Sequence, residues 1–165
     1  MRIISIFIVL CLAACQNSSI KNENQDSLAA QIVGADKDAH GCIGSAGYTW
    51  SVVKGSCIRP FEAGTRFISY DAGTGVEDST NAAFVVVSND QLKAEAFFGA
   101  TDKPIAMDAV AVMEGETMPV LFENKTELVK LRYHRDSYQL LYKDTIRYIQ
   151  LYAADNGLKT MLQKK

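Results

Sequence analysis

The chain has no apolar run long enough to cross a membrane as a helix, which takes about 20 such residues. It also has no excess of basic residues, since 17 Lys and Arg stand against 19 Asp and Glu and the formal net charge is −2. That balance argues against a nucleic-acid partner, which would require a basic patch. The sequence contains no Gly-x-Ser-x-Gly motif, no P-loop and no His-Glu-x-x-His motif, and no Ser-His-Asp order stands out. We therefore expect no catalytic residues and favour a protein that is not an enzyme.

The sequence begins with a short hydrophobic leader. Arg2 precedes an apolar stretch, Ile3–Leu12, and the stretch ends in Leu12-Ala13-Ala14-Cys15. This is too short for a membrane span and is typical of a signal peptide over residues 1–14. Leu-Ala-Ala-Cys resembles the lipobox of bacterial lipoproteins, which implies cleavage before Cys15 and acylation of its thiol and new amine. An ordinary secretory signal with an incidental cysteine is the alternative.

Lipidation predicts a cell-envelope location. Acyl chains on Cys15 would anchor the protein, since each buried methylene contributes about 0.8 kcal/mol. Gln16 follows Cys15 and leaves inner versus outer membrane open. Because the aspartate that commonly retains lipoproteins at the inner membrane is missing, we favour the outer membrane, facing the periplasm or the cell surface. Residues 15–33 are mostly polar and predict a flexible tether. A disulfide module at 34–62, an antiparallel β domain at 63–152 and a polar tail at 153–165 complete the expected organisation.

The module is defined by two cysteines, Cys42 and Cys57, 15 positions apart. In an oxidising compartment we expect them to form a disulfide, which for a loop of this size stabilises by about 3 kcal/mol in the chain-entropy model. Tyr48 and Trp50 lie inside the loop, where they either cover the disulfide or form a ligand platform. Residues 48–50 and 57–59 predict a short hairpin, and Ser51 could instead cap one helical turn.

The same segment offers possible metal ligands, because Asp36, Asp38 and His40 lie close to the two cysteines. Zinc sites usually show paired short spacings such as Cys-x-x-Cys, and that pairing is missing. We therefore predict no metal and no other cofactor.

A longer string in the same module resembles a motif of a family of bacterial envelope lipoproteins. The motif runs Asp-x-His-Gly-Cys-Ile-x-Ser-Ala-Gly-Tyr-x-Trp, followed by Cys-Ile-Arg and then Phe-Glu or Trp-Glu. The matching positions are Asp38, His40 to Ile43, Ser45 to Tyr48, Trp50, Cys57 to Arg59, and Phe61-Glu62. The resemblance covers about 30 residues. It implies the envelope location and no particular activity.

After the module come short segments with the alternation of antiparallel strands. They are Ala82–Val87, Leu92–Ala96, Ile105–Met113, Pro119–Phe122, Glu127–His134, Tyr138–Tyr142 and Ile146–Leu151. About seven strands at short spacing predict a mainly β fold, a small antiparallel barrel or sandwich. The composition of residues 71–81 predicts a polar loop. Pro119 indicates an edge strand. The Lys-Ala-Glu-Ala run predicts a strand with one solvated face.

One strand face carries a basic stripe, Lys130, Arg132 and His134. It could face an acidic protein or an anionic envelope polymer, and a plain solvated strand face explains it equally well. With Tyr48 and Trp50, these residues are our candidate binding surface.

The strand region from Ala82 to Leu151 is similar to the periplasmic and membrane-bound inhibitors of c-type lysozyme, which are small β-barrels. The similarity rests on Phe-Val-Val-Val-Ser-Asn-Asp followed by short strands and a late Tyr-x-Leu-Leu-Tyr-Lys. The inhibitors' Ser-Gly-x-x-Tyr loop and Trp-x-Lys-Gly strand are absent, so no inhibitory residue carries over. We expect a lipid-anchored envelope protein that acts as a non-enzymatic binding or structural module. A lysozyme inhibitor and an envelope-polymer hydrolase are the alternatives.

Overall fold

The structure is a computed structural model, and it describes residues 36–99, 103–114, 118–150 and 157–163. The expected signal peptide at 1–14, the lipidation site Cys15 and the tether at 15–33 lie outside the described residues.

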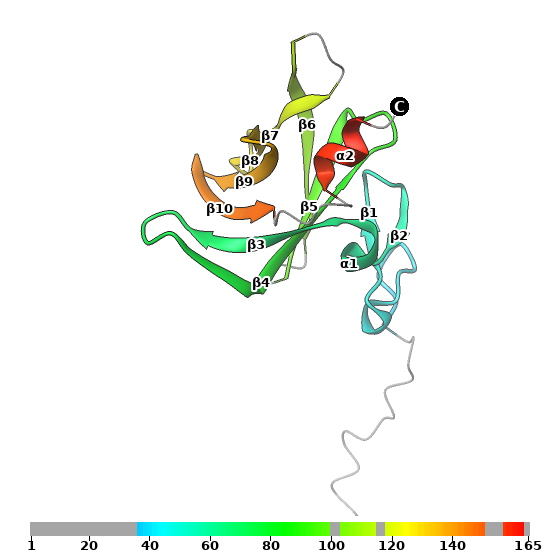
Figure 1. Cartoon of the computed structure of the whole chain (residues 1–165). Coiled ribbons are helices and arrows are strands. Elements are labelled where there is room, and N and C mark those ends of the chain that lie inside the picture. The colour runs from blue at the N-terminus through cyan, green and yellow to red at the C-terminus, as the bar shows by residue number, and fades with distance from the viewer. Residues whose placement is uncertain (1–35, 100–102, 115–117, 151–156, 164–165) are drawn as a thin grey trace, which may run out of the picture. The chain divides into compact units, whose positions relative to one another are not determined.

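The described strands form a two-stranded hairpin and a closed eight-stranded barrel (Figure 1). The barrel strands are β3 (Thr65–Asp71), β4 (Val76–Val87), β5 (Lys93–Phe98), β6 (Ile105–Val112), β7 (Pro119–Asn124), β8 (Val129–His134), β9 (Ser137–Tyr142) and β10 (Thr145–Gln150). Each strand pairs antiparallel with the next along the chain, and β10 pairs with β3 to close the ring. The predicted mainly β fold and the antiparallel barrel are confirmed, with eight barrel strands where the sequence indicated about seven.

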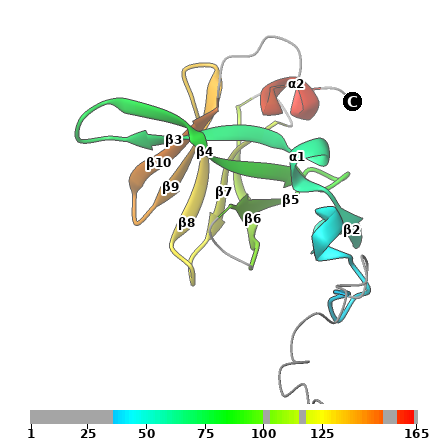
Figure 2. The same cartoon turned by 90° about the horizontal axis from the view of Figure 1, so that it is seen from below.

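The strand that the sequence did not reveal is β3, and the predicted loop at 71–81 is wrong for the same reason. Strand β4 begins at Val76, so only residues 72–75 connect the two strands. The turn is built from its own residues: the Asp71 carboxylate accepts from the Gly73 amide at 2.8 Å, and Gly75 adopts a φ of +74°. The resulting β3–β4 hairpin projects beyond the barrel (Figure 2), where polar strand residues face solvent on both sides.

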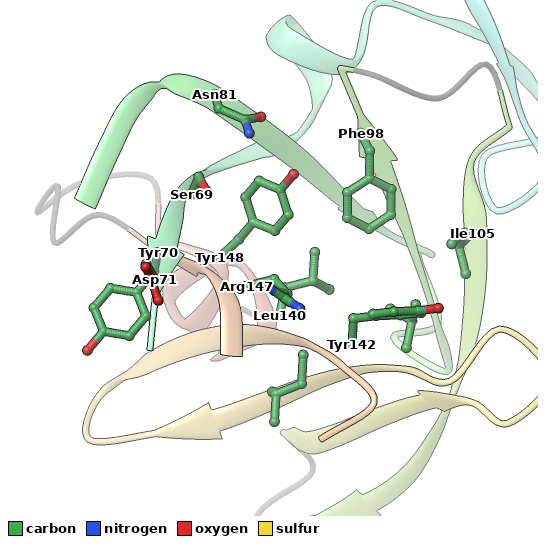
Figure 3. Close-up of a pocket in the computed structure, with 12 residues that line it drawn as sticks. Ser69, Tyr70, Asp71, Asn81, Phe98, Ile105, Leu140, Tyr142, Arg147 and Tyr148 are labelled. Atoms are coloured by element: carbon green, nitrogen blue, oxygen red, sulfur yellow. The ribbon is translucent and has the colours of Figure 1, made fainter. Parts of the chain in front are cut away.

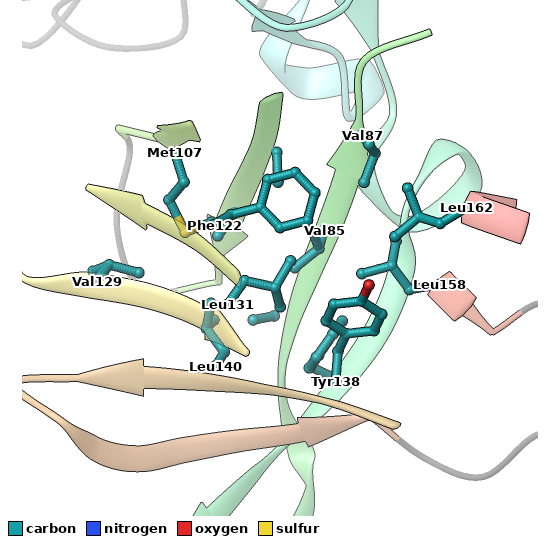
Figure 4. Packing of buried hydrophobic residues seen from close by; sticks show 14 of the residues in the cluster. Val85, Val87, Met107, Phe122, Val129, Leu131, Tyr138, Leu140, Leu158 and Leu162 are labelled. Atoms are coloured by element: carbon teal, nitrogen blue, oxygen red, sulfur yellow. The ribbon is translucent and has the colours of Figure 1, made fainter. Parts of the chain in front are cut away.

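The barrel interior is filled by residues that alternate along the strands. The large side chains of Phe67, Phe122 and Leu131 share this core with the small side chains of Ala94 and Ala96. Figure 4 shows Phe122 and Leu131 within the cluster. On β8, Val129 and Leu131 point inward while Lys130, Arg132 and His134 point outward, as the sequence predicted.

Strand β4 is buried on both faces at its C-terminal end. Ala83, Val85 and Val87 belong to the core, and Val86 on the outer face is 1% exposed. The continuous apolar run at 82–87 predicted this. Glu95, the partner of Val86 on β5, is also fully buried, so the expectation of a solvated face is wrong at Glu95 and holds at Lys93, which is exposed.

One end of the barrel is closed by α2 (Leu158–Gln163). Leu158 and Leu162 are buried in the core next to Val87 and Tyr138 (Figure 4). The Lys159 ammonium also pairs with Asp136 at 2.8 Å. The part of the expected polar tail that the structure describes is therefore a packed helix that seals the barrel.

Pro119 does not mark an edge strand, and that prediction is wrong. Strand β7 lies between β6 and β8 in a closed ring, which has no edges. Pro119 is the first residue of β7 and pairs with Val112 at an irregularity of the ladder, a place where a missing backbone donor is tolerated.

The module before the barrel consists of η1 (Gly44–Ala46), β1 (Thr49–Ser51), β2 (Ser56–Ile58) and α1 (Pro60–Ala63). Strands β1 and β2 form the predicted hairpin, and Cys42 and Cys57 form the predicted disulfide. Ser51 ends β1 and also caps the turn that follows, because its hydroxyl accepts from the Lys54 amide at 3.0 Å.

Candidate functional site

Within the described residues, the barrel end opposite α2 is an open mouth with a cavity of about 540 Å³ (Figure 3). The two ends can be told apart from the β4–β5 pairing: Val87 pairs with Ala94 at the closed end, and Ala83 pairs with Phe98 at the mouth. A cavity of this size falls within the usual range of about 300–1,000 Å³ for small-molecule sites.

The floor and walls of the mouth cavity are apolar. Val129 and Leu140 belong to the buried core, and Phe98 and Ile105 pack against that core from β5 and β6. Tyr148 crosses from β10, with its ring centroid 5.6 Å from that of Phe98. A ligand body in this space would replace water over apolar side chains, which is the usual source of affinity in such pockets.

The rim of the mouth cavity is polar and aromatic. Its side chains come from the β3–β4 hairpin and from the β9–β10 turn region, as Figure 3 shows. They are Tyr70, Asp71, Asn81, Tyr142 and Arg147.

Two of these rim residues sit where the strand ladder is irregular. In the β9–β10 pairing, Ile146 is opposite Leu141 and Tyr148 is opposite Leu140, so Arg147 is an extra residue without a partner on β9. A bulge of this kind re-aims side chains. Arg147 and its neighbour Tyr148 consequently both line the same cavity.

The second irregularity lies between β3 and β4. Ile68 pairs with Ala82 and Ser69 with Asp78, so residues 79–81 are extra on β4. The Asp78 carboxylate accepts from the amide and hydroxyl of Thr80 at 2.8 and 2.6 Å, which holds the extra residues in shape. Asn81 at the end of this segment lines the mouth cavity.

The electrostatics of the rim centre on Asp71 and Arg147. The hydrogen bond from the Gly73 amide, then that from Thr74, and also the charge of Arg147 hold the pKa of Asp71 below its ordinary value. Asp71 is thus engaged within its own turn, and it makes no direct ion pair with Arg147. Within the described part of the chain, the Arg147 guanidinium has no hydrogen-bond or ion-pair partner.

The disulfide module uses its motif residues to hold itself together. The Asp38 carboxylate accepts from the amides of His40 and Cys42 at 2.8 and 2.9 Å. The His40 ring stacks on Trp50 with centroids 4.3 Å apart, and the Arg59 guanidinium lies 4.6 Å from the centroid of Tyr48. The two aromatic residues proposed as a ligand platform therefore each have an intramolecular partner already.

The other polar residues of the module have structural partners as well. Asp36 accepts from the Ser45 hydroxyl at 2.8 Å and from its amide, and these bonds hold the pKa of Asp36 below its usual value. The Arg59 side chain donates to the Ala46 carbonyl at 3.0 Å and pairs with Glu62 at 3.0 Å. Across the described ranges, no group of three or more His, Cys, Asp or Glu side chains is placed to hold a metal ion.

A buried clasp joins the module to the barrel. The Glu95 carboxyl group accepts from the Ser51 hydroxyl and from the amides of Val52 and Val53, at 3.2 and 3.4 Å for the two amides. Glu95 and Ser51 are both fully buried. The clasp fixes the hairpin on the outer face of β5 and explains why a carboxyl group can be buried on that face.

The basic stripe is on another side of the molecule. Lys130 pairs with Asp144 at 2.6 Å and with Glu123 at 3.5 Å, and Arg132 donates to Gln139 at 3.0 Å. Strand β8 is three strands away from β5, to which the module is clasped. The five residues of the candidate binding surface thus fall on two separate surfaces.

The mouth residues were not singled out from the sequence. Tyr142, Arg147 and Tyr148 lie in a segment whose strands were predicted, but nothing in the sequence marks the bulge that turns Arg147 toward the cavity. Asn81 was hidden because residues 71–81 read as an ordinary polar loop.

Comparisons with protein-family models, with curated proteins and with solved structures found no match for this chain. Among the helices of the described residues, none is long and apolar enough to span a membrane. The function is therefore inferred from the residues and geometry of this chain.

Proposed function

We propose that this protein is a lipid-anchored envelope protein that binds a small ligand in the open mouth of its barrel. The observation that carries the proposal is the mouth cavity, with an apolar floor and a rim of aromatic and polar side chains. Mouths of β-barrels are common positions for such sites, and a few polar groups around an apolar pocket fix a ligand's orientation. The Leu-Ala-Ala-Cys string before residue 16 supports the anchored location.

The cavity also bears on the hydrolase alternative. A glycosidase mechanism uses two carboxyl groups that flank the bond to be cleaved. Among the described residues that line the mouth, Asp71 is the single carboxylate, and its turn engages it. Binding of a small ligand requires no second carboxyl group, and the residues that line the mouth cavity are sufficient for it.

The experiment that tests binding fills the cavity. Ile105→Trp places a large side chain in the mouth, and Val112→Trp on the same strand is the control, because Val112 is exposed. We use the full chain carrying Cys15→Ala, so that no attached acyl chain can occupy the cavity, and the uncharged dye N-phenyl-1-naphthylamine. We expect saturable binding that weakens at least about tenfold in Ile105→Trp and is unchanged in Val112→Trp. A dye that does not bind, or that binds both Trp variants like the parent, would refute the site.

The anchor is tested separately. Cys15→Ala is expected to move the protein from the membrane fraction to the soluble fraction, because the acyl chains supply the affinity for the bilayer. Retention in washed membranes of variant protein from which residues 1–14 have been removed would refute lipidation at Cys15.

A further inference from the structure

We propose that the ligand of the mouth cavity is an amphipathic anion: an apolar chain fills the cavity, and a carboxylate or phosphate group binds Arg147 at the rim. The inference rests on the proposed function and names the chemical class of its ligand.

The position of Arg147 is the first argument. A regular β10 would have no residue between the partners of Leu141 and Leu140, and Arg147 is the residue inserted there. Because of the bulge, Arg147 and Tyr148 both line the cavity. In Figure 3, Arg147 lies between Tyr148 and Tyr142. A guanidinium at the edge of an apolar cavity offers a fork of donors that matches a carboxylate or phosphate.

The second argument is that the described structure leaves this guanidinium unused. By contrast, Lys93, Lys130 and Arg132 on the barrel wall each bond to a neighbouring side chain. Arg66 on β3 donates to the Ser79 carbonyl. Asp71 is near enough for its pKa to respond to the charge of Arg147, but its carboxylate accepts from Gly73 instead of forming an ion pair with it. Among the described residues, the donors of Arg147 therefore have no partner and can bind an incoming anion.

Other rim groups reinforce the same choice. The second bulge brings Asn81, whose amide can donate a hydrogen bond, and the Thr80 and Asp78 contacts hold that segment in advance. The Lys143 ammonium lies 5.1 Å from the centroid of the Tyr142 ring, which adds a second cation beside the mouth. Preformed donors avoid the cost of ordering them when the ligand binds.

The apolar part of the ligand follows from the floor. Beneath the rim lie Phe98, Ile105, Val129 and Leu140. A small inorganic anion would leave this surface in contact with water, whereas an attached hydrocarbon chain would cover it and remove apolar area from water. The arrangement of charge above and hydrocarbon below therefore suits one molecule with both parts.

The test compares ligands that differ only at the head. Dodecanoate, dodecyl phosphate, dodecanol and dodecylammonium, each below its micelle concentration, compete with N-phenyl-1-naphthylamine for the full chain carrying Cys15→Ala. Inorganic phosphate is the anion without a chain. We expect the two dodecyl anions to compete best, and Arg147→Gln to weaken them about 10- to 100-fold while leaving dodecanol unchanged.

Two further variants sharpen the result. Arg147→Lys is expected to retain part of the preference for anions, since it keeps the charge and loses the fork. Arg132→Gln is the matched control, because Arg132 points outward from β8. It is expected to bind every competitor like the parent.

Each contrary outcome has a distinct meaning. Equal competition by dodecanol and dodecanoate, with no effect of Arg147→Gln, would overturn the anionic assignment and leave the binding site intact. Competition by inorganic phosphate as strong as that by dodecyl phosphate would overturn the amphipathic assignment. Failure of the dye itself to bind would remove the proposed function and this inference together.

Discussion

The clasp between Glu95 and the hairpin gives the sharpest prediction about stability. The perturbation is Glu95→Gln, which keeps the shape of the side chain and replaces one acceptor oxygen with a donor NH₂. In the native structure the two oxygens accept from three donors: the Ser51 hydroxyl and the amides of Val52 and Val53. Whichever way the new amide turns, at least one backbone N–H faces another donor.

The magnitude follows from that unsatisfied group. A buried donor left without an acceptor costs about 1–3 kcal/mol. The Val52 and Val53 amides are only partly buried, so we expect the free energy of unfolding to fall by about 1–2 kcal/mol. For a folded unit of this size that corresponds to a fall in Tm of about 4–8 °C.

The assay pairs global and local measurements. Chemical denaturation gives the free energy of unfolding, and amide hydrogen exchange reports the Val52 and Val53 N–H groups directly. Glu77→Gln is the control, because Glu77 is exposed on β4. Its free energy of unfolding should stay within about 0.5 kcal/mol of the parent.

The clasp would be refuted by a Glu95→Gln variant as stable as the parent, with unchanged exchange at Val52 and Val53. A loss of stability without faster exchange at these two amides would place the effect elsewhere in the barrel. Only the combination of lower stability and faster local exchange supports the geometry.

Three further predictions concern stability. Replacing both Cys42 and Cys57 by Ser is expected to lower the free energy of unfolding by about 3 kcal/mol, and mass spectrometry finding both thiols free in native protein would contradict the role of the bridge. Leu158→Ala should cost about 2–5 kcal/mol by leaving a cavity at the closed end, whereas Met161→Ala on the same helix, which removes a largely exposed side chain, should cost far less. The hydrogen bond from Lys159, followed by that from Tyr133, lowers the pKa of Asp136 below 3.8. The ionised Asp136 carboxylate therefore stabilises the fold above pH 3.8, and this stabilisation is lost as the pH falls through the lowered pKa. Denaturation at several pH values should therefore show the difference between the parent and Asp136→Asn shrinking in acid, and a constant difference would count against the pair.

The alternation of side chains made most of the barrel predictable. On β8 the apolar residues Val129 and Leu131 alternate with the basic residues Lys130 and Arg132. This two-residue period determines which face of the strand enters the core. The disulfide was predictable too, because two cysteines, Cys42 and Cys57, follow the lipidation site expected at Cys15. These features depend on residues close in sequence or on simple counting.

Strand β3 and the start of β4 were not predictable in the same way. Residues 71–81 carry mostly turn-forming and polar side chains, and a strand that is polar on both faces has no hydrophobic pattern to reveal it. What makes it a strand is pairing with its neighbour in a hairpin, which is a property of the turn at residues 72–75. The β-branched and aromatic residues of Thr65–Asp71 were the available signal for β3.

Burial of Glu95 and the orientation of Arg147 depended on contacts between distant segments. The alternation of side chains along β5 places Glu95 on a face that would ordinarily be exposed to solvent. Glu95 is buried because the β1–β2 hairpin docks there, and its contact Ser51 lies 44 positions earlier in the chain. For Arg147 the deciding fact is a mismatch between two strands, which neither strand shows alone. Sites that depend on such offsets have to be read from the folded chain.

The bulge at Arg147 has a consequence for how selectivity could change over time. Removing that one residue would join Ile146 to Tyr148 and restore an uninterrupted pairing with Leu141 and Leu140. The strand would remain paired, and the group proposed to bind the anion would be lost with the deletion of a single codon. The fold and the proposed ligand preference thus depend on different features of the sequence. The fold depends on the alternation of apolar and polar residues, and the preference depends on one inserted residue in β10.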